Sequence, residues 1–130
     1  MSTTSETLNA AADHIERRGW TRGSWGEPST GSGPLCIEGA LIAALGISWL
    51  ELDYEEFQTC PSYVAVMQHL GRPQTTTQFA SGRSGLVNPL YMWNDCSLKR
   101  TQAEVVEVLR AAAICTAAAQ QPVVELVGAL

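Results

Sequence analysis

The chain of 130 residues is long enough for one domain, and its 45% of hydrophobic residues can form a core without disulfides. Only 16% of the residues are charged, and eight Lys and Arg against thirteen Asp and Glu leave a net charge of -5. This balance disfavours nucleic acid as a partner, because binding to phosphate backbones depends on Lys and Arg.

The first predicted helix starts at a capping box, in which Thr3 and Glu6 each bond a free backbone amide of the other. Apolar side chains then recur at helical spacing as far as Ile15, and Gly19 is placed to end the helix. Residues 1–4, ahead of most of this helix, are expected to be flexible.

A long loop is predicted for residues 21–34, a stretch that is rich in glycine, serine and proline. Loops of this length in a small domain are usually functional or mobile. Trp25 lies alone in the loop, and so large an aromatic side chain either folds back on the core or meets a partner. We therefore expect a binding surface around Trp25 that includes Arg22.

Residues 35–45 are apolar on almost every side and predict a buried helix, which Gly46 caps. We expect this helix to pack between the first and last helices of the chain. Gly39 costs about 1 kcal/mol in a helix relative to alanine. Its presence therefore indicates the close approach of another group, such as the ring of Trp93.

The middle of the chain has weaker signals. Pro61 suits the first turn of a further helix. Residues 72–89 are polar and irregular, with room for a short hairpin around Ser81 and Gly82. Arg83 lies in this segment, and we count it with the candidate binding residues.

The last predicted helix covers residues 102–119 and starts at a second capping box, formed by Thr101 and Glu104. The tail, residues 122–130, is expected to fray. The chain is thus predicted to be mainly α, one domain over residues 1–130, built as a small bundle of about four helices with long irregular loops.

The four cysteines do not suggest a metal site. No CxxC pair occurs among Cys36, Cys60, Cys96 and Cys115, so no zinc knuckle is expected. The first residues show no secretory signal, and the longest apolar run, residues 35–45, is too short to span a bilayer. We expect a cytoplasmic protein with reduced thiols, without a cofactor and without contact to a membrane.

The sharpest candidate for catalysis is a thiol. Cys36 lies near the start of the apolar helix, where free amides and the helix dipole can lower a thiol pKa. A catalytic thiol also needs a base and an orienting group, and His69 with Asp95 would complete such a set. The competing interpretation, a small packed side chain, is favoured because nothing local marks His69 or His14 as a base.

Glu38 is the second polar group beside the apolar helix. Near a helix start, a carboxylate is stabilised by free amides, so its simplest role is that of an anchor. The alternative is a buried acid that pairs with an arginine, such as Arg22 or Arg110. With either role, Glu38 and Gly39 are interpreted as structural residues that set how the helices meet.

Trp93, Asn94 and Asp95 form a second structural motif ahead of the last helix. Asn and Asp side chains bond nearby backbone groups, and a tryptophan here would fill the core, so we predict an ordered corner. The alternative makes Asp95 a general base or a metal ligand. One carboxylate without neighbouring His or Asp is a poor metal site, and no metal is expected.

Four motifs follow one another along the chain: Ile15-Glu16-Arg17-Arg18-Gly19-Trp20, Cys36-Ile37-Glu38-Gly39-Ala40-Leu41, Trp93-Asn94-Asp95 and the run from Thr101 to Ala112. Their order resembles that in a family of small uncharacterised proteins common in actinobacteria and their phages. The resemblance covers both ends of the chain and skips residues 50–89, and Thr21 stands where a cysteine is often seen. It implies a mostly helical domain and a phage or mobile-element origin. The family has no assigned activity, so no catalytic residue carries over.

From these observations we expect a small, phage-type interaction protein that binds and modulates a host protein without catalysis. The low-charge acidic surface, the long loops and Trp25 fit that expectation. The alternative is a hydrolase or transferase that depends on Cys36.

Overall fold

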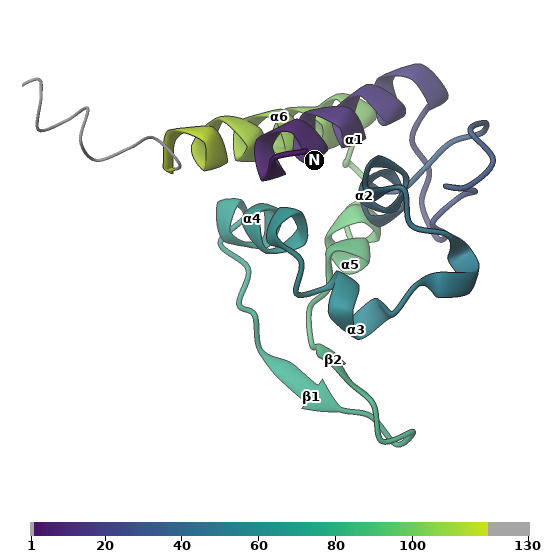
Figure 1. Ribbon diagram of the computed structural model, residues 1–130, viewed down its shortest axis with the longest axis vertical. Helices are drawn as coiled ribbons and strands as arrows, with labels where there is room; N and C mark the ends of the chain where they lie inside the picture. The colour runs from purple at the N-terminus through teal and green to yellow at the C-terminus, as the bar shows by residue number, and fades with distance from the viewer. Residues whose placement is uncertain (1, 120–130) are drawn as a thin grey trace, which may run out of the picture.

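The computed structural model describes residues 2–119, which form a mainly helical fold with one small sheet, as the sequence predicts (Figure 1). Four longer helices match the predicted ones, α3 is the short helical turn that Asp53 is placed to cap, and α5 is a short addition. In chain order the elements are α1 (Thr4–Arg18), α2 (Ile37–Leu45), the 3₁₀ turn η1 (Trp49–Glu51), α3 (Tyr54–Phe57), α4 (Pro61–His69), β1 (Thr76–Gln78), β2 (Ser84–Leu86), α5 (Leu90–Asp95) and α6 (Gln102–Ala119).

Helix α1 holds the centre of the packing. It lies along α6 on one side and contacts α2 on another, while α4 packs against α6 (Figure 1). The expectation that residues 35–45 lie between the first and last helices is therefore wrong. The reason is the small side chains Ala11, Ala12, Ala112 and Ala113, which are buried in α1 and α6 and allow these two helices to approach closely.

Helix α2 begins at Ile37, two residues later than Leu35, because Cys36 is still extended and serves as the N-cap. Leu35 instead bonds the loop before it: its N–H donates to the carbonyl of Gly19 and its carbonyl accepts from the N–H of Thr21. These bonds fold the long loop, residues 21–34, back against the helices. The end of α2 is as predicted, with Gly46 in the left-handed region at φ +69°.

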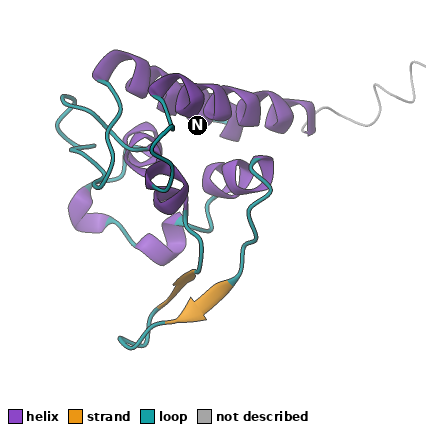
Figure 2. Cartoon of the chain, turned by 180° about the vertical axis from the view of Figure 1, so that it is seen from behind, coloured by secondary structure: helices purple, strands orange, loops and turns teal. Residues whose placement is uncertain are grey.

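Strands β1 and β2 form the hairpin for which the sequence has room. They are antiparallel, with Thr76 opposite Leu86 and Gln78 opposite Ser84, and Gly82 in the turn has φ +87°. The hairpin extends away from the helices (Figure 2). Only its second strand reaches the core, where Leu86 is buried.

The predicted corner at residues 93–95 is wrong in form, because it is the second half of helix α5. Trp93 and Asn94 point inward from it and are buried. The helix escapes prediction because it has fewer than two turns, and its N-cap, Pro89, offers no side-chain cap. Helix α5 is stabilised by packing against α2, whereas the longer helices carry strong local signals in their own sequence.

The two predicted capping boxes form to different extents. Thr3 caps α1 through the predicted box with Glu6, and Thr4 is already helical. At α6 the box is half formed, since Thr101 accepts from the amide of Glu104 while the Glu104 carboxylate pairs with Arg100 instead. The predicted frayed tail lies outside the described residues. Among residues 2–119, no helix is long and apolar enough to cross a membrane.

Candidate functional site

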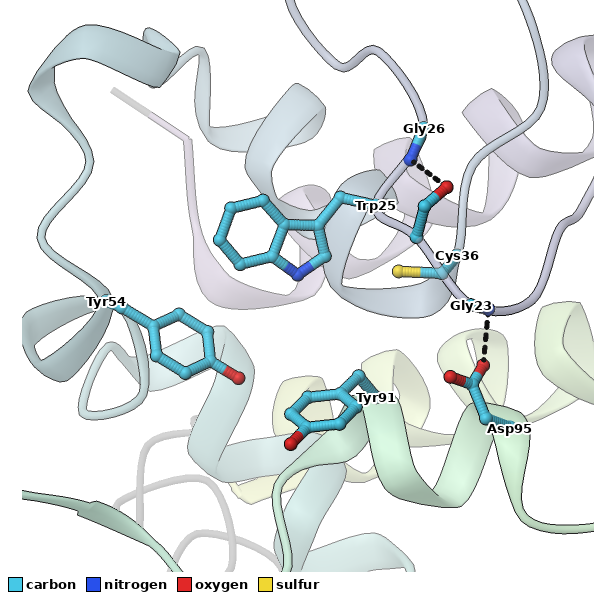
Figure 3. Close-up of a pocket in the computed structure, with 8 residues that line it drawn as sticks. Gly23, Trp25, Gly26, Cys36, Tyr54, Tyr91 and Asp95 are labelled. Atoms are coloured by element: carbon cyan, nitrogen blue, oxygen red, sulfur yellow. Dashed lines mark hydrogen bonds between the residues drawn. The ribbon is translucent and has the colours of Figure 1, made fainter. Parts of the chain in front are cut away.

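A cavity of about 430 Å³ opens between the long loop, the start of α2, α3 and α5 (Figure 3). Three aromatic rings face it from three separate segments, together with one carboxylate and one thiol. Its lining consists of Gly23, Ser24, Trp25, Gly26, Cys36, Tyr54, Tyr91 and Asp95.

The buried carboxyl of Glu38 fixes two of these rings from behind. Its Oε1 accepts from the indole N–H of Trp25 at 2.9 Å and from the hydroxyl of Tyr54 at 3.0 Å. Its Oε2 accepts from Tyr54 at 2.9 Å, from the hydroxyl of Tyr63 at 2.6 Å and from the backbone N–H of Tyr91 at 3.3 Å. The side chain is fully buried, so these donors replace its water.

Glu38 has no arginine partner among residues 2–119, so the alternative of a buried acid paired with Arg22 or Arg110 is wrong. Arg110 pairs with Asp13 and Glu16 on α1, at 2.6 and 2.8 Å. Burial raises the pKa of Glu38, and the donated hydrogen bonds oppose that rise. Burial and the nearby carboxyl also raise the pKa of both phenols that bond it.

Gly39 explains how the loop reaches this position. A Cβ on Gly39 would lie 2.0 Å from the carbonyl oxygen of Trp25, so only glycine lets the loop backbone rest against α2. The close approach predicted for Gly39 is confirmed, but it comes from the backbone of Trp25 and not from the ring of Trp93. Trp25, the tryptophan of the loop, is folded back and half-buried.

Asn94 ties the loop, α2 and α5 together. Its Oδ1 accepts from the indole N–H of Trp20 at 2.7 Å and from the N–H of Ile37 at 3.0 Å. Its Nδ2 donates to the carbonyl of Thr21 at 3.0 Å and to Oδ1 of Asp95 at 2.9 Å. All four hydrogen-bonding positions of the amide are thus used, which is the structural role that the sequence suggests.

Asp95 stands at the edge of the cavity. Its Oδ1 accepts from the backbone N–H of Gly23 at 3.1 Å, and this bond holds the loop against α5 (Figure 3). Trp93 is part of the core, and the guanidinium of Arg100 lies 3.9 Å from the centre of its ring. Arg100 also bonds the carbonyl of Trp93, so α5 is joined to the start of α6.

The three catalytic candidates do not converge. Cys36 and Asp95 line the cavity, but His69 lines a different hollow. Burial raises the pKa of the Cys36 thiol to about 12, and its Sγ accepts from the N–H of Gly39 at 3.3 Å. A neutral, packed thiol is the interpretation that these facts support.

The binding candidates also lie apart. Arg22 donates to the carbonyl of Arg100 at 2.8 Å and stacks on the ring of Trp20. Arg83 lies in the hairpin, beside a polar hollow that it shares with residues of α3 and its N-cap. Of the three, only Trp25 lines the aromatic cavity.

The second hollow, of about 490 Å³, lies between α4 and α6. His69 and Cys115 are both at its edge and both exposed. No group of three His, Cys, Asp or Glu within residues 2–119 is arranged to hold a metal ion, in either hollow or elsewhere.

Sequence reasoning misses the tyrosines of the site. Nothing in the pattern singles out Tyr54, Tyr63 or Tyr91 as part of a site. No local signal exists, because each becomes significant through its contact with Glu38. The usable signal is a glutamate within an apolar helix, since a buried carboxyl requires donors from elsewhere in the chain.

The chain belongs to a family of unknown function (DUF6197), whose sequence model matches residues 1–114. That match covers both predicted motif regions and the segment between them, including the whole lining of the aromatic cavity. No curated protein and no solved structure matches the chain.

Proposed function

We propose that this member of the family is a small, non-enzymatic interaction protein that binds a partner protein at the aromatic cavity. The observation that carries the proposal is that three aromatic rings from separate segments line one open cavity. Trp25 and Tyr54 are fixed by Glu38, while Tyr91 is 44% exposed at the surface. Aromatic side chains around a preformed hollow are typical of binding hot spots.

The same proposal makes the protein phage-encoded and its partner a host protein, which the protein modulates in the host cytoplasm. The support for that origin is the ordered set of motifs that resembles actinobacterial and actinophage proteins, from Ile15-Glu16 to Trp93-Asn94-Asp95. The acidic net charge of -5 supports a basic surface on the partner.

Site-specific photo-crosslinking tests the proposal. A benzophenone amino acid replaces Tyr91, and in a control chain it replaces Glu107, which is exposed on α6 away from the cavity. In an actinobacterial lysate we expect one saturable adduct from position 91, competed away by excess unmodified chain. Equal adducts from both positions, or none from position 91, would overturn the proposal.

Thiol chemistry distinguishes the proposal from an enzyme that depends on Cys36. With a pKa of about 12, roughly one Cys36 side chain in 10⁴ is ionised at pH 8. We therefore expect iodoacetamide at pH 8 to label the exposed Cys96 and Cys115 while Cys36 stays unlabelled in the folded chain. Peptide mass spectrometry gives the labelled positions, and rapid labelling of Cys36 would restore the enzymatic alternative.

A further inference from the structure

We propose that the aromatic cavity binds the ammonium group of a lysine side chain presented by the partner protein. This inference rests on the proposed function, because it names the group on the partner that the cavity recognises. Four features carry it: the ring faces, the carboxyl groups, the lack of a basic group among the described lining residues and the size of the cavity.

The rings supply the first attraction. Trp25 and Tyr54 have centroids 5.6 Å apart and are tilted by 39°, and Tyr91 faces the same space from α5 (Figure 3). A cation over such faces is attracted by the ring quadrupole, most strongly at tryptophan. The indole N–H and the phenol both donate to Glu38, so the two rings are held in place before a ligand arrives.

Carboxyl groups without a counter-ion supply the second attraction. Asp95 is one of the residues that line the cavity. Its Oδ1 accepts hydrogen bonds from Gly23 and Asn94, while its Oδ2 has no hydrogen bond to residues 2–119. Neither Asp95 nor Glu38 takes part in an ion pair within that part of the chain. An incoming ammonium would therefore be the counter-ion at this site, with Asp95 in direct reach.

The nearby arginines do not fill that role. Arg22 is engaged by the carbonyl of Arg100 and the ring of Trp20, and Arg100 is engaged by Trp93 and Glu104. No Lys or Arg is among the described residues that line the cavity. An anionic ligand would be repelled by Asp95, the one charged side chain among the described lining residues, and a purely apolar ligand would strip water from Asp95 without replacing it.

The size of the cavity suits a side chain. A volume of about 430 Å³ lies within the range of pockets that enclose small ligands, and Tyr91, one of the lining residues, is 44% exposed at the surface. Lysine fits the arrangement because its long apolar stem can lie along ring faces while its head reaches a carboxylate. The acidic net charge would assist approach of a basic segment.

Titration with capped amino acids tests the inference on the full chain. N-acetyl-lysine amide is added while the indole N–H of Trp25 and the amide N–H of Gly23 are followed by nuclear magnetic resonance. N-acetyl-norleucine amide is the uncharged counterpart, and N-acetyl-arginine amide tests the other cationic side chain. We expect saturable shifts at both reporters with the lysine compound and at least tenfold weaker binding of the norleucine compound.

Asp95→Asn supplies the matched variant, since an asparagine oxygen can still accept from Gly23 and keep the loop in place. We expect it to weaken binding of the lysine compound at least tenfold, while Glu107→Gln, which removes the same charge elsewhere, leaves binding unchanged. Equal weakening in both variants, equal binding of norleucine amide, or tighter binding of arginine amide would overturn the inference.

The two proposals fail separately. A specific adduct from position 91, together with no response to lysine amide, leaves the interaction protein standing and removes its lysine ligand. Saturable binding of lysine amide without any adduct supports the cation site and overturns the proposed partner protein.

Discussion

Two hollows of this molecule, the aromatic cavity and the hollow between α4 and α6, are similar in size, about 430 and 490 Å³, and each has a cysteine in its lining. They differ in what lies behind them. The aromatic cavity is backed by Glu38 and Asn94, which are fully buried and bond groups from the loop, α2, α3, α4 and α5. The hollow between α4 and α6 is edged by exposed side chains such as Gln68 and His69.

That difference separates a preorganised site from a surface depression. Buried polar groups tolerate few arrangements, because each unmet donor or acceptor costs free energy. The rings of Trp25 and Tyr54 are consequently held in one geometry, while no side-chain hydrogen bond within residues 2–119 holds Gln68 or His69 at the second hollow. The same contrast predicts that substitutions behind the first cavity cost far more stability than substitutions around the second.

The largest effect is expected from Gly39→Ala. The new methyl group would meet the carbonyl oxygen of Trp25 at 2.0 Å, and a backbone atom cannot rotate away as a side chain can. We expect a loss of about 3 kcal/mol or more in the free energy of unfolding, measured by urea denaturation. The indole resonance of Trp25 should shift as the loop lifts.

Gly31→Ala is the matched control for that experiment. Gly31 has φ +78° in the same loop, but a Cβ added there would meet no group within 4 Å beyond its chain neighbours. Backbone strain alone should cost about 1 kcal/mol. If Gly39→Ala costs no more than this, the close packing of the loop on α2 is not what forms the cavity.

A smaller loss is expected from Glu38→Gln. The shape is kept, but one oxygen becomes an NH₂ group that must face a donor, either the indole of Trp25 or the hydroxyl of Tyr63. We expect a loss of about 2 kcal/mol in the free energy of unfolding. His69→Gln, at the edge of the second hollow, should stay within about 0.5 kcal/mol of the parent chain. Equal losses in the two variants would contradict the contrast between the hollows.

The sequence predicts this molecule well where the signals are local. The capping box at Thr3 and the glycine at position 46 set helix ends through contacts within a few residues, so their spacing is visible in the chain. Glu38 and Gly39 are also marked locally, as a carboxyl and a bare backbone inside an apolar helix. What the pattern lacks is their partners.

Those partners are distant in the chain, which is why the sequence does not reveal them. Trp25 precedes Glu38 by 13 residues, Tyr54 and Tyr63 follow it by 16 and 25, and Tyr91 by 53. A tyrosine that bonds a buried acid has the same local pattern as one that only fills space. Charge alone suggests arginine as the partner of Glu38, whereas neutral donors from four segments make the hydrogen bonds to its carboxyl.

The smallest effect concerns the thiol of the aromatic cavity at alkaline pH. The pKa of Cys36 is raised from 9.0 to about 12 in the folded chain, so the unfolded chain loses this proton first as pH rises. Stability from this group is complete below pH 9 and falls toward pH 12. Between pH 8 and pH 10 the fall should be about 1.4 kcal/mol in the free energy of unfolding.

Cys36→Ser keeps a side-chain acceptor for the amide of Gly39 but does not titrate, so its urea curves should lack that part of the fall. Cys115→Ser removes the exposed thiol of the second hollow and is the control. If it reduces the alkaline fall in the free energy of unfolding as much as Cys36→Ser does, the burial of Cys36 is not the cause of that fall.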